Sequence, residues 1–384
     1  MNSAMEAVSR RIVGTCGSAR RYYSGVQWRR PILPLRAVAL VLAGFGQAGA
    51  QAPAKAPPPP PLITAWTVAL PGIPVAPPGV DTEAAYVVLR GSRLAALALR
   101  DGTLAWSVPV TDVTVPPATA PGLVLLARQN EVEALDTRTG ARRWRVPIDG
   151  TVAVPLLSEG GWLLAVTDDG RATMLRAATG ETLWTQPLGG PTRVQPVVAG
   201  RQVYVALQDG RVAALAIETG KPIWQTKLPA EATTLQPLDD RLFAGASDRF
   251  LYCLSADRGK RKWRWRTGGT IVGTTVGAAN RVYFLSLDNV LRSLNRTDGN
   301  QRWKSAVPHR PTGGPFLIGS LLFVPGVSSA LPAFQLADGR LAGNVKLGGE
   351  VPGTAVLVPG SEGRAARLLV VSGDGVAQLL EPGR

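Results

Sequence analysis

The sequence predicts an all-β fold, an eight-bladed β-propeller of four-stranded antiparallel blades. The first observation behind this prediction is a Gly-x-x-x-Trp motif that recurs along the chain. From Trp106 to Trp303 the Trp residues of successive motifs are 38, 40, 40, 39 and 40 residues apart, and such a constant period is typical of repeat architectures. The second observation is that the segments between motifs are short apolar or alternating runs separated by Gly-containing turns, without the 3.6-residue spacing of helices.

Eight windows of the repeat can be counted if the period is extended in both directions. One step back from Trp106 reaches Trp66, and one step forward from Trp303 reaches Gly343, where the Trp is absent. The Trp residues at the repeat positions are Trp66, Trp106, Trp144, Trp184, Trp224, Trp263 and Trp303.

The clearest repeat lies between Thr192 and Leu228. It contains runs at 194–198, 202–207, 211–217 and 222–228, with tight turns at Gly210 and Gly220, where Gly can adopt a positive φ. Four such strands form one antiparallel meander. One meander cannot bury both of its faces, so we expect several to pack side by side around an axis.

The two ends of the repeat region are complementary. Residues 63–70 have the pattern of a Trp strand without three strands before it, and residues 367–380 end where a Trp strand should follow. We therefore predict that the N-terminal strand completes the last blade and closes the ring, which removes exposed sheet edges.

Residues 1–51 resemble an export signal. Arg29, Arg30 and Arg36 precede an apolar run at 37–45, and Ala48-Gly49-Ala50 follows as a cleavage-type site. The two Arg at 29–30 leave a twin-arginine route open beside the general one. No Cys follows the apolar run, so we expect no lipid anchor. Residues 52–61 form a Pro-rich linker, and 62–384 the propeller. These features predict an exported, periplasmic protein with no membrane-spanning segment.

The net positive charge of the chain allows two interpretations. The net charge is +15, which favours a polyanionic partner, but the basic residues are scattered through the repeats among acidic ones. A solvated surface is therefore the first interpretation, with no nucleic-acid partner. Cys253 is expected in the core, and His309 on a surface loop. With one His in the chain, the sequence contains no zinc cluster.

The repeat resembles the tryptophan-docking repeat of the PQQ-type β-propeller family, whose pattern is A-x-D-x-x-T-G-x-x-x-W. Residues 134–144 match the pattern fully, and residues 214–224 match with the acid displaced. The resemblance implies that each Trp packs between neighbouring blades. The seven Trp are then structural residues.

The family contains quinoprotein dehydrogenases, outer-membrane assembly propellers and extracytoplasmic sensor propellers. Its dehydrogenases hold PQQ and calcium, often beside a disulfide of adjacent Cys. This chain has no adjacent Cys pair and no acidic cluster suited to calcium. We expect no catalytic, cofactor or metal residue, and a quinoprotein enzyme or a ligand-binding sensor remains the alternative.

The chain is most similar to the outer-membrane assembly propellers of this family. That resemblance implies a non-enzymatic scaffold, here a monomer peripheral to the outer membrane, whose partner is an envelope protein such as the β-barrel insertase. It also implies two partner-binding loops, at 188–195 and 229–236. Leu188, Arg193 and Glu231 are the candidate contact residues.

Overall fold

The computed structural model describes residues 62–278, 280–348, 354–360 and 365–383. The predicted export signal and the Pro-rich linker lie outside the described residues. All regular secondary structure in the described ranges is β-strand, and these ranges contain no helix long and apolar enough to cross a membrane.

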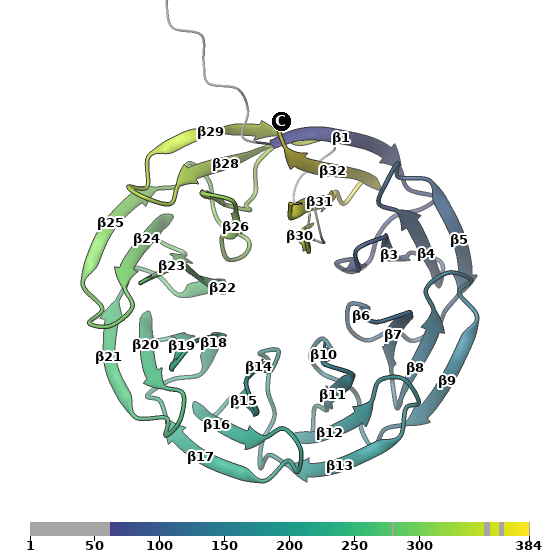
Figure 1. Ribbon diagram of the computed structural model, residues 1–384, viewed down its shortest axis with the longest axis horizontal. Helices are drawn as coiled ribbons and strands as arrows, with labels where there is room; N and C mark the ends of the chain where they lie inside the picture. Colours follow the sequence, from purple (N-terminus) through teal and green to yellow (C-terminus); the bar gives the residue numbers. More distant parts are fainter. Residues whose placement is uncertain (1–61, 279, 349–353, 361–364, 384) are drawn as a thin grey trace, which may run out of the picture. The chain divides into compact units, whose positions relative to one another are not determined.

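The strands form eight antiparallel sheets of four strands each, arranged as blades around a common axis (Figure 1). The predicted eight-bladed propeller is thereby confirmed. Blades 1 to 4 consist of β2 (Gly79–Val80), β3 (Ala84–Leu89), β4 (Arg93–Ala98) and β5 (Leu104–Pro109); β6 (Ala118–Ala120), β7 (Leu123–Arg128), β8 (Glu131–Asp136) and β9 (Arg142–Pro147); β10 (Leu157–Glu159), β11 (Trp162–Val166), β12 (Arg171–Arg176) and β13 (Thr182–Pro187); and β14 (Val197–Ala199), β15 (Gln202–Ala206), β16 (Arg211–Ala216) and β17 (Pro222–Lys227).

Blades 5 to 8 repeat this order. They consist of β18 (Ala232–Leu238), β19 (Arg241–Ala246), β20 (Phe250–Ser255) and β21 (Arg261–Arg266); β22 (Ile271–Ala278), β23 (Arg281–Ser286), β24 (Val290–Asn295) and β25 (Gln301–Ala306); β26 (Phe316–Ile318), β27 (Leu321–Phe323), β28 (Ala330–Gln335) and β29 (Leu341–Lys346); and β30 (Thr354–Val358), β31 (Arg367–Val371), β32 (Val376–Pro382) and β1 (Leu62–Ala69).

Blade 8 is built from both ends of the described chain. Strand β1 pairs antiparallel with β32, with Leu62 opposite Pro382 and Ala69 opposite Val376. The predicted closure by the N-terminal strand is therefore correct, and Figure 1 shows β1 as the outermost strand between β29 and β5.

The hydrophobic core consists of eight clusters, one between each pair of neighbouring blades. The cluster between blades 4 and 5, for example, joins Tyr204 and Ala214 to Leu242 and Leu254. Side chains alternate across a strand, so the buried strands of each blade send one set of residues to the preceding blade and the other set to the following blade. No blade has a core of its own, and each depends on both neighbours.

Each blade has two kinds of connection, which lie at opposite ends because successive strands are antiparallel. Turns between the first and second strands and between the third and fourth strands lie at one end, which we call the docking rim. Turns between the second and third strands, and the crossovers to the next blade, lie at the other end, the crossover rim. Gly210 (φ 91°) lies in a turn at the crossover rim, as the sequence predicted, and Asn289 (φ 58°) occupies the equivalent turn of blade 6.

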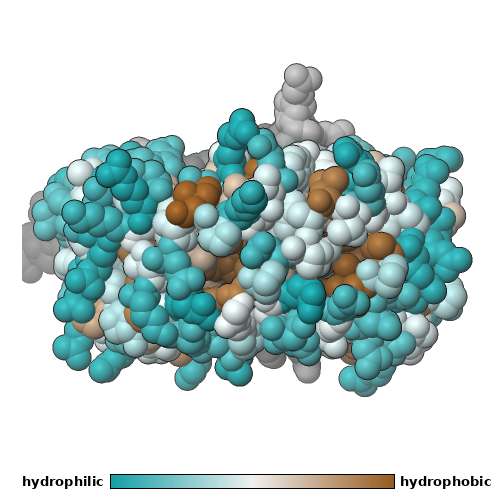
Figure 2. Space-filling model, turned by 90° about the horizontal axis from the view of Figure 1, so that it is seen from below, coloured by the Kyte–Doolittle hydropathy of each residue, from teal (hydrophilic) through white to brown (hydrophobic). Residues whose placement is uncertain are grey.

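The outer side of the ring is formed by the Trp-containing strands. Figure 2 shows it from the side of β13 and β17, where the surface is mostly hydrophilic and its hydrophobic areas are small and separate. Ile223 of β17 is one exposed hydrophobic side chain, at 47%. The exposure of β17 alternates along its length, as expected for the solvent-facing edge strand of a sheet.

Candidate functional site

Each of the seven Trp residues bridges two blades. Its indole Nε1 donates a hydrogen bond to a backbone carbonyl after the third strand of the next blade, so the half-buried ring has its single N–H satisfied. The pairs are Trp66 to Leu99 (3.1 Å), Trp106 to Thr137 (2.8 Å), Trp144 to Ala177 (3.0 Å), Trp184 to Ile217 (2.9 Å), Trp224 to Ala256 (2.8 Å), Trp263 to Arg296 (3.0 Å) and Trp303 to Leu336 (3.2 Å).

The Gly of each motif forms the surface on which the preceding Trp lies. Gly220 has a φ of 68°, and a Cβ atom added there would lie 2.6 Å from Cε3 of Trp184. Real Cβ atoms essentially never approach a neighbour this closely. The Gly is therefore required twice, for the left-handed turn conformation and for direct contact with the ring.

The junction between blades 7 and 8 lacks both parts of this contact. Gly343 stands at the Trp position of β29, opposite Ala333. The neighbouring strands β32 and β1 come from opposite ends of the described chain, so no hairpin turn joins them to supply the Gly. Leu62 is 1% exposed and packs there with Phe323 and Leu331 of blade 7. The Trp is missing where its docking turn is also missing.

The two predicted partner loops lie on consecutive crossovers at the crossover rim. The first, 188–195, connects β13 to β14 as predicted. The second prediction is partly wrong, because β18 begins at Ala232 and residues 232–236 pair with β19. The β-branched side chains of Thr233 and Thr234 favour a strand at this position. Arg193 is exposed, whereas Leu188 and Glu231 are half-buried.

The backbone around Arg193 and Glu231 is held by hydrogen bonds. Thr192 is 2% exposed, and its Oγ1 donates to the carbonyl of Ala206 (2.6 Å) and accepts from the amide of Val194 (3.2 Å). The carbonyl of Glu231 accepts from the amide of Ser247 (2.9 Å). Ordered backbone therefore presents both charged side chains at the same rim, on neighbouring blades.

The residues that could act in catalysis lie apart from these loops. Burial raises the pKa of Cys253 to about 12, so its thiol is protonated and unreactive at neutral pH. The prediction of a surface His309 is wrong, because the ring is half-buried and packs closely on Gly326. Burial lowers the pKa of His309. The described residues contain no group of three or more His, Cys, Asp or Glu that could hold a metal ion.

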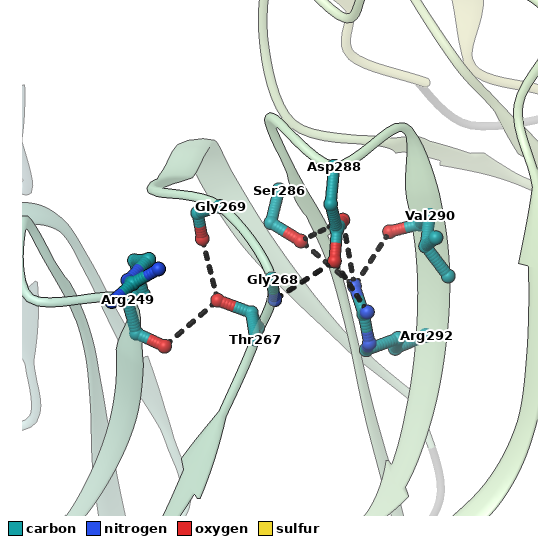
Figure 3. Close-up of polar contacts among 8 residues, drawn as sticks. All are labelled: Arg249, Thr267, Gly268, Gly269, Ser286, Asp288, Val290 and Arg292. Atoms are coloured by element: carbon teal, nitrogen blue, oxygen red, sulfur yellow. Dashed lines mark hydrogen bonds and ion pairs between the residues drawn. The ribbon is translucent and has the colours of Figure 1, made fainter.

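An ion pair within blade 6, between Asp288 and Arg292, lies at the crossover rim beside the crossover from blade 5 (Figure 3). Arg292 is 9% exposed, and its Nη2 lies 2.6 Å from Oδ2 of Asp288. The same oxygen accepts from the amide of Gly268 (2.9 Å), and Oδ1 accepts from Ser286 (2.6 Å). Burial opposes ionisation of Asp288, but the bonds from Arg292 and Ser286 outweigh it and lower its pKa to about 2. With its oxygens occupied, this cluster holds the crossover between the blades in place.

Among the grooves of the described residues, one lies between blades 1 and 2, one between blades 4 and 5, and one between blades 6 and 7, all at the docking rim. Their volumes are about 640, 560 and 350 Å³. Each is lined by a Tyr at the same position of the second strand: Tyr86, Tyr204 and Tyr283. The Tyr204 hydroxyl and the Trp224 indole donate to the same carbonyl, that of Ala256 (3.4 and 2.8 Å). The repeated Tyr is visible in the sequence, but only the docked blades show that it lines a groove.

The sequence of this chain matches the model of one known protein family. The family model described as outer membrane protein assembly factor BamB matches residues 128–237 and 238–378, together more than half of the chain. The chain belongs to the BamB family. No curated protein sequence matches it.

Solved structures share the fold of this BamB-family chain at low sequence identity. BamB from Moraxella catarrhalis is 19% identical with a TM-score of 0.70, and the match covers 83% of this chain and 99% of that one. Sqt1 from Saccharomyces cerevisiae is 9% identical (TM-score 0.73; 84% and 99% covered). The quinohemoprotein alcohol dehydrogenase ADHIIG from Pseudomonas putida HK5 is 13% identical (TM-score 0.65; 84% and 76% covered). These matches concern the fold alone.

Proposed function

We propose that the chain is a non-enzymatic, exported scaffold that acts in the assembly of outer-membrane β-barrel proteins. Membership of the BamB family carries the proposal. As such a scaffold, the protein is periplasmic and monomeric, and it acts at the outer membrane. Its partner is an envelope protein, the β-barrel insertase.

The contact that we propose uses the crossover rim of blades 4 and 5. Arg193 and Glu231 lie on consecutive crossovers whose backbones are held by hydrogen bonds, and the half-buried Leu188 packs against the cluster between blades 3 and 4. Opposite charges on adjacent, preorganised loops favour one orientation of a partner with the complementary pattern. A preformed surface also reduces the entropy lost on binding.

Deletion of the gene in its host tests this proposal. We expect lower levels of outer-membrane barrel proteins, restored by the wild-type gene and not by a gene carrying Arg193→Glu and Glu231→Lys. Unchanged barrel levels in the deletion strain, measured by quantitative proteomics of the envelope, would overturn the proposal.

The dehydrogenase in the comparison makes a PQQ-dependent enzyme the second candidate. The residues described here do not fit that cofactor pair. The described residues contain no cluster of acidic side chains suited to calcium. Cys253 is the free cysteine among them, and it is buried with no adjacent Cys. We therefore expect no rise in melting temperature when PQQ and Ca²⁺ are added at saturating concentration, whereas bound cofactor would raise it by linkage.

A further inference from the structure

The outermost strands of blades 5 and 6 carry an unusual concentration of positive charge. Strands β21 and β25 contain six exposed cationic side chains and no acidic residue. We call this surface the basic wall; it comprises Arg261, Lys262, Arg264, Arg266, Arg302 and Lys304. The basic residues were expected to be scattered among acidic ones. On the outermost strands of these two blades they are not.

The cations of the basic wall are not neutralised within the described part of the chain. None of the six takes part in a salt bridge there, and Arg264 instead lies 4.7 Å above the ring of Phe250. The outer strand of blade 2 provides the contrast. Its Arg142, Arg143 and Arg145 all lie within ion-pair distance of acidic residues of their own blade, namely Glu131, Glu133 and Asp136.

Strands β21 and β25 are neighbouring outer strands of the ring (Figure 1), and all six cations on them are exposed. Residues two apart on a strand are about 6–7 Å from each other. Like charges at this spacing repel even in water. An extended layer of anions would relieve the repulsion along both strands at once.

The shape of the wall distinguishes among polyanions. Trp263 and Trp265 alternate with the cations, but both are half-buried against the core between blades 5 and 6. They therefore offer no open face for the base stacking that single-stranded nucleic acids use. Lys262 lines the groove between blades 4 and 5, and the other five cations lie outside the three grooves described above. A flat anionic surface fits best.

We propose that the basic wall binds the headgroup layer of an anionic phospholipid bilayer. The proposal takes the envelope location from the proposed function, but it uses a different surface. The ring then stands on its edge at the membrane. Both rims stay accessible, including Arg193 and Glu231 at the crossover rim.

Vesicle co-sedimentation of the full chain tests the proposal. The probes are phosphatidylcholine vesicles with and without about 30% phosphatidylglycerol. The test variant carries Lys262→Gln, Arg264→Gln, Arg302→Gln and Lys304→Gln. The control carries Arg90→Gln, Arg138→Gln, Arg310→Gln and Lys346→Gln, which are exposed elsewhere and change the net charge equally. Both variants retain the basic N-terminal region, so that region cannot account for a difference between them.

We expect the wild type to partition onto anionic vesicles at least about tenfold better than onto neutral ones, and to lose this preference at high salt. The test variant should lose about tenfold or more, and the control less than about threefold. Equal losses in both variants, equal binding to both vesicles, or stronger binding to a single-stranded oligonucleotide or to polyglutamate would each overturn the proposal. Thermal melts establish that both variants are folded.

The vesicle result is independent of the scaffold function. A protein that binds anionic vesicles through the wall but recovers no insertase would retain this inference and lose the proposed partner. The reverse outcome would retain the partner and remove the membrane contact.

Discussion

At the scale of single residues, the blades are held together by pairs that each consist of a Trp on one blade and a turn Gly on the next. Each Trp lies on the turn Gly of the next blade and donates to a carbonyl beside it. The contact combines burial of an aromatic ring with one satisfied polar group, which is favourable inside a protein. Because neither partner works without the other, both are sensitive to substitution.

Trp224→Ala removes one such ring from between blades 4 and 5. We expect a loss of about 3–5 kcal/mol in unfolding free energy, as for other buried aromatic truncations, measured by denaturant unfolding. Gln225→Ala on the same strand is exposed and should change little. An unchanged midpoint for Trp224→Ala would show that the ring is not a structural contact.

Gly220→Ala tests the other half of the pair. Gly220 and Gly200 both have positive φ, 68° and 57°, so Ala strains both turns. Only at Gly220 would the new Cβ meet a Trp ring; at Gly200 it meets nothing within 4 Å. Gly220→Ala should therefore cost about 1–3 kcal/mol more than Gly200→Ala, the typical cost of overpacking. Equal losses would mean that the turn conformation alone selects the Gly.

Asp288 makes stability depend on pH. Its pKa is lowered to about 2 in the folded protein, from about 3.9 in an unfolded chain. Its ionisation therefore stabilises the fold above pH 4, and this contribution is lost as the pH falls through 2. The stability difference between wild type and Asp288→Asn should shrink by about 2 kcal/mol between pH 6 and pH 2. A difference that is constant over this range would refute the assigned ion pair.

At the scale of strands and turns, the sequence predicted most of the blade. The turn positions at Gly210 and Gly220 and the neighbouring apolar runs are local signals, so β15, β16 and β17 fall within about one residue of their predicted limits. The start of β18 was missed because its Thr-rich beginning resembles a loop. The Asp288–Arg292 pair lies within blade 6, and its bond from Gly268 depends on the crossover from blade 5. The packing of His309 and the Tyr-lined grooves likewise depend on tertiary contacts that periodicity does not specify.

The exception at Gly343 follows from how the ring closes. A Trp there would face blade 8, where β32 and β1 are paired but not joined by a Gly turn. Gly343→Trp should therefore not raise the melting temperature, although it restores the repeat pattern. An increase of several degrees, corresponding to about 1 kcal/mol or more, would show that docking needs no turn Gly.

At the scale of the whole molecule, contacts between neighbouring blades hold the ring together, and the loops and outer strands are free to carry different side chains. The loops of Leu188, Arg193 and Glu231, the grooves at the docking rim and the basic wall occupy different surfaces of one ring. Fold similarity to an assembly factor and to a dehydrogenase alike shows that the ring itself does not select a function. The function depends on the side chains that the loops and outer strands present.

Affinity purification from the envelope fraction tests the scaffold function most directly. The comparison uses the wild type, the crossover-rim variant Arg193→Glu/Glu231→Lys, and the matched docking-rim variant Arg138→Glu/Glu218→Lys. We predict that the wild type and the docking-rim variant recover the β-barrel insertase, and that the crossover-rim variant recovers about tenfold less. Absence of the insertase from the wild-type sample, or equal recovery by all three proteins, would contradict the proposed scaffold.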